Sequence, residues 1–248
     1  MRRKKNKKYK KAILNLILYI ILLSILIYSG IKIFKWHKDK TNNNKIVEQI
    51  KSAVIVEEKN KDEYTVDFNR LKEQNNETIA WLKVNNTNIE YPVVKGTNNS
   101  FYLNHSFDKS NNSAGWIFAD YRNKFDNTDK NIVIYGHNMR DGSMFGSMLN
   151  ILNAKWYENE ENTNITLYTE NEKCIYKVFS VYKIENEDYY IKTEFKNDNE
   201  FEGFVKNLKK RSIKDFNVYV SKDDNILTLS TCANNNKYRV VLHSIKDK

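Results

Sequence analysis

A run of twenty apolar residues near the N-terminus limits what the start of this chain can fold into. Residues 12–31 include only Asn15, Ser24 and Ser29 as clearly polar members. Twenty helical residues rise about 30 Å, which is enough to cross the hydrocarbon core of a bilayer. Eight Lys or Arg residues lie within residues 1–11, whereas only three lysines flank the far side of the run. The positive-inside rule then predicts a cytoplasmic N-terminus and an exported C-terminal part.

A cleaved signal peptide is the alternative interpretation of this run. The apolar part of a signal peptide usually spans about 7–15 residues and is closed by an Ala-x-Ala-like site. The run here is longer, and no such site follows it. We therefore expect an uncleaved anchor and a chain of four parts. These are a cytoplasmic basic segment (1–11), a transmembrane helix (12–31), a linker (32–44) and one extracellular catalytic domain (45–248).

The charge distribution argues against nucleic acid as a partner. The formal net charge is +10, but residues 1–40 hold twelve Lys or Arg and a single acid, Asp39. The rest of the chain carries 29 basic and 30 acidic residues. The excess of positive charge therefore belongs to the anchor, where it would favour anionic lipid headgroups.

Two cysteines, Cys174 and Cys232, are too few for a disulfide framework. A bridge between them is possible by count, but it would consume the candidate nucleophile. Cys174 lies in an apolar run, where a buried structural thiol is the expected role. We find no carboxylate cluster that would hold a calcium ion, and we expect neither a metal nor a cofactor.

The pattern beyond residue 44 predicts a mainly β domain with a few helices. Helical spacing marks residues 45–59, 143–158 and 200–211, and a short helix is expected over 66–74 with Asp67 as its cap. The β-like runs are residues 78–84, 88–94, 115–119, 131–135, 164–169, 173–184, 225–232 and 237–245. Eight short strands with few helices favour a barrel-like domain.

A cysteine, a histidine and an arginine stand at the ends of these runs. Cys232 ends the run 225–232, and alternation places Ser230 on its face of the strand and Leu227 on the other. Arg239 follows on the next run, and His137 lies just beyond the run 131–135.

These three side chains have the chemistry of a cysteine acyl-transfer enzyme. A thiolate is the competent nucleophile, and a nearby imidazole can share its proton and later donate it to a leaving amine. Arg239 cannot act as a base, but its guanidinium can hold a carbonyl or stabilise an oxyanion. Each residue alone is ordinary, since cysteines at strand ends are more often structural and surface arginines more often form ion pairs.

Other functions use some of the same parts. A papain-type cysteine peptidase also pairs Cys with His, but its nucleophile starts a helix, whereas Cys232 ends a predicted strand. An L,D-transpeptidase would carry His-Gly directly before the cysteine, where this chain has Ser230-Thr231. A non-enzymatic anchored adhesin or scaffold with incidental Cys and His is the alternative from a different class.

The motifs together resemble those of the sortases, the membrane-anchored cysteine transpeptidases of Gram-positive cell surfaces. The resemblance rests on two motifs: Thr-Leu-Ser-Thr-Cys at 228–232 with Arg239 downstream, and Tyr-Gly-His-Asn at 135–138. Residues 136–146, and Tyr-Pro-Val-Val at 91–94 followed by 101–107, look most like class B. Class D sortases can share the pentapeptide.

The resemblance implies an eight-stranded sortase-type β-barrel with N-terminal helices and an inserted helix before the cysteine strand. It implies that Cys232 cleaves a C-terminal sorting signal after Thr and forms a thioacyl enzyme, with His137 as acid and base and Arg239 as stabiliser. Ser230 and Leu103 are the implied substrate contacts. The implied partners are surface proteins with a sorting signal and a peptidoglycan amine. Neither an NPxTN-like nor an LPxTG-like signal is selected by these residues.

Overall fold

The computed structural model describes residues 2–52, 54–56, 64–185, 187–233 and 237–247. The chain divides into two compact units, residues 1–44 and 45–248. The first unit is helical, and the second contains all the strands that the structure describes.

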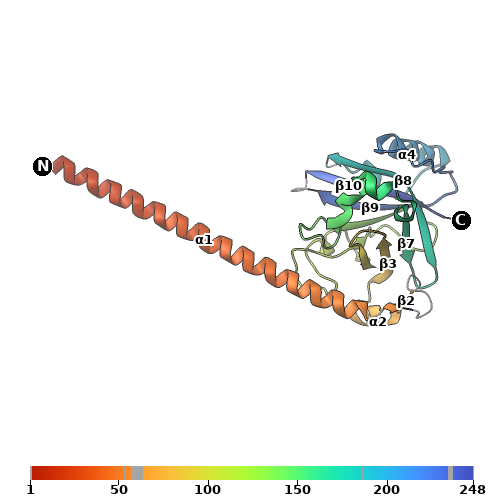
Figure 1. Ribbon diagram of the computed structural model, residues 1–248, viewed down its shortest axis with the longest axis horizontal. Helices are drawn as coiled ribbons and strands as arrows, with labels where there is room; N and C mark the ends of the chain where they lie inside the picture. The colour runs from red at the N-terminus through yellow and green to blue at the C-terminus, as the bar shows by residue number, and fades with distance from the viewer. Residues whose placement is uncertain (1, 53, 57–63, 186, 234–236, 248) are drawn as a thin grey trace. The chain divides into compact units, whose positions relative to one another are not determined.

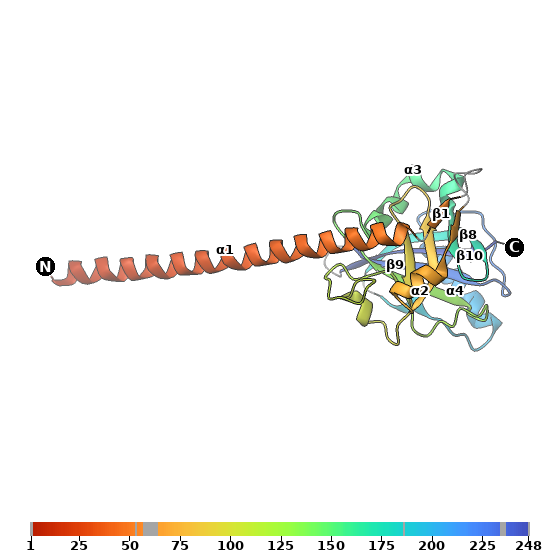
Figure 2. The ribbon, with the colours of Figure 1, turned by 90° about the horizontal axis from the view of Figure 1, so that it is seen from below.

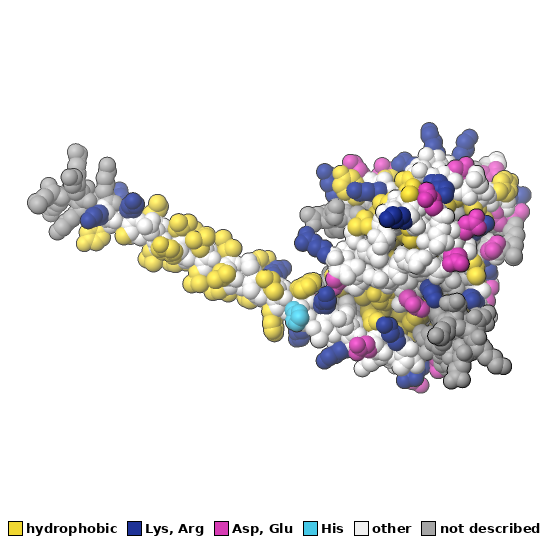
Figure 3. Space-filling model, in the orientation of Figure 1, with side chains coloured by type: hydrophobic (Ala, Val, Ile, Leu, Met, Phe, Trp, Pro, Cys, Tyr) yellow, Lys and Arg dark blue, Asp and Glu magenta, His cyan; other side chains and the backbone are white. Residues whose placement is uncertain are grey.

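Helix α1 (Arg2–Lys51) carries the apolar run predicted to be the anchor. Its large apolar side chains are exposed on all sides of the helix from Ile13 to Phe34, and those on the visible face form the yellow band in Figure 3. A helix that is apolar on every side is typical of a membrane span. Among the described residues, α1 contains the one segment long and apolar enough for this, by length and composition.

The structure gives one N-terminal segment a secondary structure and corrects the expected bounds of another. Residues 32–44, expected to be a linker, are helical and belong to α1. The helix predicted over 45–59 ends at Lys51, and Val54–Val56 forms strand β1 instead, paired with β2 (Tyr64–Val66). Residues 57–59 lie outside the described part. Val54 and Val56 are β-branched, which favours a strand over the last turn of a helix.

The second unit is a closed barrel of eight strands, as predicted (Figure 1, and from below in Figure 2). Around the barrel the order is β10-β8-β7-β3-β4-β5-β6-β9. The pairs β4/β5 and β6/β9 are parallel and the others antiparallel. The strands are β3 (Thr78–Val84), β4 (Glu90–Val94), β5 (Phe118–Ala119), β6 (Asn131–His137), β7 (Asn164–Tyr168), β8 (Lys173–Glu185), β9 (Ile226–Ala233) and β10 (Tyr238–Lys246).

Helices fill the connections between strands. Residues 143–158 were expected to form one helix, but they form the 3-10 helix η2 (Gly146–Leu152) and then α3 (Ala154–Tyr157), with Asn153 capping the second. An Asn side chain competes for backbone hydrogen bonds, which favours a break there. The remaining helices are η1 (Phe101–Leu103), α2 (Phe68–Gln74), η3 (Glu160–Thr163), η4 (Tyr189–Ile191) and α4 (Asp198–Arg211).

Both faces of the barrel wall at β9 are buried. Leu227 and Leu229 point into the barrel core, as their alternation predicted. Ile226, on the opposite face, belongs to a second apolar cluster with Phe201 and Leu208 of α4. Helix α4, which lies beside β8 in Figure 1, therefore seals the outside of the wall that carries the cysteine strand.

Candidate active site

Strand register brings the three predicted catalytic residues together. On the parallel pair β6/β9, His137 is the Cα partner of Cys232, and on the antiparallel pair β9/β10, Cys232 is the partner of Arg239. Neighbouring strands lie about 4.8 Å apart. The backbones of the three residues therefore stand side by side on consecutive strands, with Cys232 in the middle.

A tight turn after β6 fixes the backbone of His137. Its carbonyl oxygen accepts hydrogen bonds from the backbone N–H groups of Met139 and Phe145, at 3.1 and 3.0 Å. The Phe145 ring packs on the residue before the histidine, Gly136, where an added Cβ would lie 2.7 Å from the ring. Only glycine leaves room for the Phe145 ring at this position, which explains why a glycine precedes His137.

The His137 ring is held in one tautomer. Its Nε2 lies 2.8 Å from the carbonyl oxygen of Leu103. A carbonyl can only accept, so Nε2 carries a proton and Nδ1 is the nitrogen left to exchange one. Gly115, with φ +58°, packs against this carbonyl. A Cβ at this position would lie 2.8 Å from the Leu103 oxygen and 2.5 Å from the Tyr102 oxygen, so a larger residue would push the Leu103 carbonyl away.

A groove of about 250 Å³ opens beside His137 and Arg239. Its lining comes from segments far apart in the sequence: Asn99, Leu103, Phe118, Tyr135, Gly136, His137, Glu187, Asp188, Tyr190, Ile191, Ser230, Thr231 and Arg239. Both predicted substrate contacts are among them. Leu103 is 36% exposed, whereas Ser230 is 3% exposed and its hydroxyl lies 2.8 Å from that of Tyr190.

Cys174 lies at the other end of the barrel. Arg239 pairs with Ile184 on β8, and Cys174 is ten residues earlier on the same strand. At about 3.3 Å per residue this is roughly 30 Å, whereas a disulfide needs Cα atoms within about 7 Å. A Cys174–Cys232 bridge is therefore excluded. Burial raises the pKa of the Cys174 thiol, which suits the structural role predicted for it.

The other histidines outside α1 are held by local contacts. His105 stacks on Phe101 with ring centroids 3.9 Å apart. His243 is fully buried between Tyr182 and Thr228, whose hydroxyls lie 2.9 and 2.8 Å from its two ring nitrogens. Neither lines the groove, which leaves His137 as the imidazole of this site.

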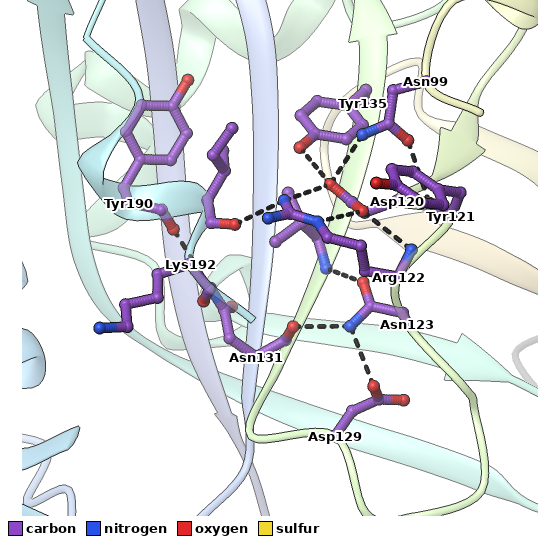
Figure 4. A network of polar contacts seen from close by, with 12 residues as sticks. Asn99, Asp120, Tyr121, Arg122, Asn123, Asp129, Asn131, Tyr135, Tyr190 and Lys192 are labelled. Carbon is purple, nitrogen blue, oxygen red and sulfur yellow. Dashed lines mark hydrogen bonds and ion pairs between the residues drawn. The ribbon is translucent and has the colours of Figure 1, made fainter. Parts of the chain in front are cut away.

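The sequence did not reveal the segment between β8 and α4 as part of the site. Glu187, Asp188, Tyr190 and Ile191 line the groove from there. Sequence reasoning also missed the polar network around Asp120 and Arg122 (Figure 4). Its signal was a cluster of polar residues, Asp120 to Asn123, directly after the run predicted as a strand.

Comparisons with known proteins show which family the chain belongs to. The sortase domain family matches residues 82–246. Sortase B of Listeria monocytogenes is 32% identical over 92% of this chain and 93% of its own length. The crystal structure of Clostridium perfringens sortase B superposes with a TM-score of 0.69 at 36% identity, covering 73% of this chain and all of that one. A substrate complex of Staphylococcus aureus sortase B gives a TM-score of 0.73 at 30% identity, covering 86% and 97%.

The family match begins within β3 and covers the other seven barrel strands, among them those that carry Cys232, His137 and Arg239, and the helix before the cysteine strand. The C. perfringens and S. aureus structures are both class B sortases. The chain belongs to the sortase family, the cysteine transpeptidases that anchor proteins to the Gram-positive cell wall, and is most like its class B members.

Proposed function

We propose that this protein is a membrane-anchored transpeptidase that cleaves a C-terminal sorting signal after Thr and joins the surface protein to a peptidoglycan amine. The observation that carries the proposal is the register of His137, Cys232 and Arg239 at one end of three adjacent strands. Those strand ends border a groove that could accept an extended peptide.

Cys232 is the nucleophile in this mechanism. His137 first takes the proton of the Cys232 thiol on Nδ1. The thiolate then attacks the threonine carbonyl carbon and a C–S bond forms, and the C–N bond breaks as the departing amine takes that proton from His137. An incoming amine then attacks the thioester, gives its proton to His137 and releases the thiolate. The Nε2–H···O bond to Leu103 supports this role, because it leaves Nδ1 to carry the transferred proton.

Arg239 stabilises the negative charge that develops on the threonine carbonyl oxygen. It lines the groove and is the Cα neighbour of Cys232, so its position fits an oxyanion. A guanidinium cannot give up its proton, which excludes acid–base work and leaves electrostatic stabilisation.

Ser230 and Leu103 contact the signal peptide in this proposal. Ser230 lies two residues before the nucleophile in the groove lining, and its hydroxyl can bond a peptide group while it keeps Tyr190. The exposed side chain of Leu103 offers an apolar contact next to His137. The S. aureus sortase B solved as a substrate complex supports a peptide in this groove.

The anchor places the catalytic domain outside the cell in this proposal. Residues 1–11 would be cytoplasmic, 12–31 would span the membrane, and 45–248 would face the cell wall. The basic flank, the apolar surface of α1 and the cell-envelope location of sortases support this single-pass topology.

The decisive experiment is mass spectrometry of the products formed from NPxTN-like and LPxTG-like peptides, with and without an amine acceptor. We expect cleavage after Thr and an amide product when the amine is present. Hydrolysis alone at every amine concentration would instead favour a cysteine peptidase. No cleavage of any signal peptide would leave the anchored surface protein as the better function.

A further inference from the structure

Asp120 is a buried carboxylate outside the lining of the groove. Its side chain is fully buried, it follows directly on β5, and it points toward Asn99 and Tyr135, which line the groove (Figure 4). The mechanism proposed above does not use it. A buried charge is costly unless it is paired and hydrogen-bonded, so its partners indicate what it is for.

Five hydrogen bonds converge on this carboxylate. Arg122 donates three of them, from its backbone N–H at 3.0 Å, from Nε at 2.8 Å and from Nη2 at 2.7 Å. Asn99 Nδ2 donates at 2.9 Å and the Tyr135 hydroxyl at 2.8 Å. Burial alone would raise the pKa of Asp120, but the bonds from Arg122, Tyr135 and Asn99 outweigh it and lower that pKa.

Arg122 extends the network to a third segment. Its Nη2 also donates to the backbone carbonyl of Ile191, at 2.9 Å. Asn99, Tyr135 and Ile191 all line the groove, and they come from three separate segments of the chain. The pair of Asp120 and Arg122, which we call the clamp, therefore joins the segment before η1, strand β6 and the segment between β8 and α4.

The segment that carries Ile191 has no strand of its own to hold it at the groove. Residues 187–192 contain only the short helix η4. Asn131 fixes two of its carbonyls to β6, those of Tyr190 and Lys192, at 3.1 and 2.9 Å. Those bonds hold the segment to the barrel wall, whereas the clamp fixes its spacing from the Asn99 segment.

We propose that Arg122 is a positioning residue that, through its contacts with Asp120 and the Ile191 carbonyl, sets the width of the groove for the sorting-signal peptide. Only a guanidinium has enough donors in a fixed fork to serve both Asp120 oxygens and a carbonyl at once. The inference rests on the proposed function for the identity of the peptide. The distance that the clamp sets between the two sides of the groove does not depend on catalysis.

The test compares the full-length protein with Arg122→Lys and with the double variant Asp120→Asn/Arg122→Gln. The double variant leaves no unpaired buried charge, so it guards against a simple failure to fold. Lys246→Gln is the matched control, because it removes one partner of the Lys246–Glu172 ion pair at the other end of the barrel. Each protein is measured for peptide turnover, for reaction of Cys232 with a small methanethiosulfonate reagent, and for amide hydrogen exchange.

We expect both clamp variants to raise KM for the signal peptide about tenfold or more. A change of this size corresponds to the loss of one charge-assisted hydrogen bond. We expect kcat and thiol reactivity to change less than about threefold, because Asp120 and Arg122 lie outside the groove lining that contains His137 and Arg239. Exchange should accelerate for residues 187–192 in the clamp variants and stay at the wild-type rate there in Lys246→Gln.

Unchanged KM and unchanged exchange in the clamp variants would overturn the inference. A fall in kcat at constant KM would also overturn it, since that assigns the pair to the chemical step. If the wild-type protein cleaves no signal peptide, the proposed function fails, and the exchange rates at residues 187–192 alone then decide whether the clamp holds the segment.

Discussion

At the scale of single residues, the two cysteines differ in where the fold places them. Cys174 is buried in the barrel core, where loss of solvation raises its pKa. Cys232 lies one residue before the end of β9, between His137 and Arg239 on the neighbouring strands. Apolar burial disfavours a thiolate, which agrees with a structural role for Cys174.

We predict that Cys232→Ala abolishes cleavage of a sorting-signal peptide, because alanine offers no nucleophile for the thioester. Cys174→Ala is the matched control, and it should keep turnover within about threefold, since it removes a single buried sulfur far from the groove. A fluorogenic peptide assay on both proteins decides the matter. Turnover retained in Cys232→Ala would remove the thioacyl mechanism.

Arg239→Lys should lower kcat by about 100-fold or more. A lysine keeps the charge but not the planar pair of donors, and the loss of one oxyanion donor costs about that much in other enzymes. Steady-state kinetics with the same peptide measure it, and circular dichroism checks that the barrel is intact. Near-normal kcat would reduce Arg239 to a structural residue.

His243 makes stability depend on pH although it lies outside the groove. Complete burial lowers its pKa from 6.5 to about 3. The unfolded chain therefore binds a proton as pH falls below about 6.5, while the folded protein does not until about pH 3. Stability is lost through that window on acidification, at about 1.4 kcal/mol for each pH unit from this residue.

Urea unfolding at pH 7 and pH 5 tests this prediction. Wild-type protein should lose about 2 kcal/mol more between these two values than His243→Gln, in which the amide can still bond Thr228 and Tyr182 but cannot titrate. An equal loss in both proteins would assign the acid sensitivity to other groups.

At the scale of helices and strands, features that depend on neighbouring residues in the sequence could be predicted. Asp67 caps α2 through the backbone N–H of Arg70, as its sequence position suggested, and α4 begins and ends within two residues of the prediction. The eight β-like runs all became barrel strands. In each case the signal is a side chain or a spacing within the element itself.

Contacts between distant segments could not be predicted in the same way. The groove needs the segment at 187–191 to lie against Ser230, and the bond between Tyr190 and Ser230 joins residues 40 positions apart. The clamp likewise joins Arg122 to a carbonyl 69 positions away. The spacing of residues within one strand or helix does not indicate such long-range pairs. The sequence therefore indicated the chemical groups of the site but not the segments that line the groove.

Helix α4 offers a test of how the outer wall of the barrel is stabilised. Leu208 is fully buried against β8 and the cysteine strand, whereas Lys206, on the other face of the helix, is exposed. Leu208→Ala should cost about 2–5 kcal/mol of unfolding free energy, and Lys206→Ala less than about 0.5. Urea unfolding measures both. Equal effects would mean that α4 does not seal the wall.

At the scale of the whole molecule, charge and hydropathy divide the chain into a basic and apolar N-terminal part and a nearly neutral remainder. The basic residues concentrate before the apolar part of α1, and the catalytic unit is close to neutral. An enzyme that joins surface proteins to the wall must meet its substrates outside the membrane. In the proposed topology α1 anchors the chain in the membrane, and the residues that line the groove all belong to the second unit.

The proposed topology predicts the outcome of protease treatment of intact protoplasts. A tag placed before residue 1 should be protected, because eight positive charges retain that end in the cytoplasm, whereas residues 45–248 should be digested. Detergent-permeabilised protoplasts are the control, in which the tag is lost as well. Reversing the charges of residues 2–11 to Glu should weaken the protection of the tag. A tag that is digested in intact protoplasts, with the barrel protected, would place the groove in the cytoplasm and leave the transpeptidase without a cell-wall acceptor.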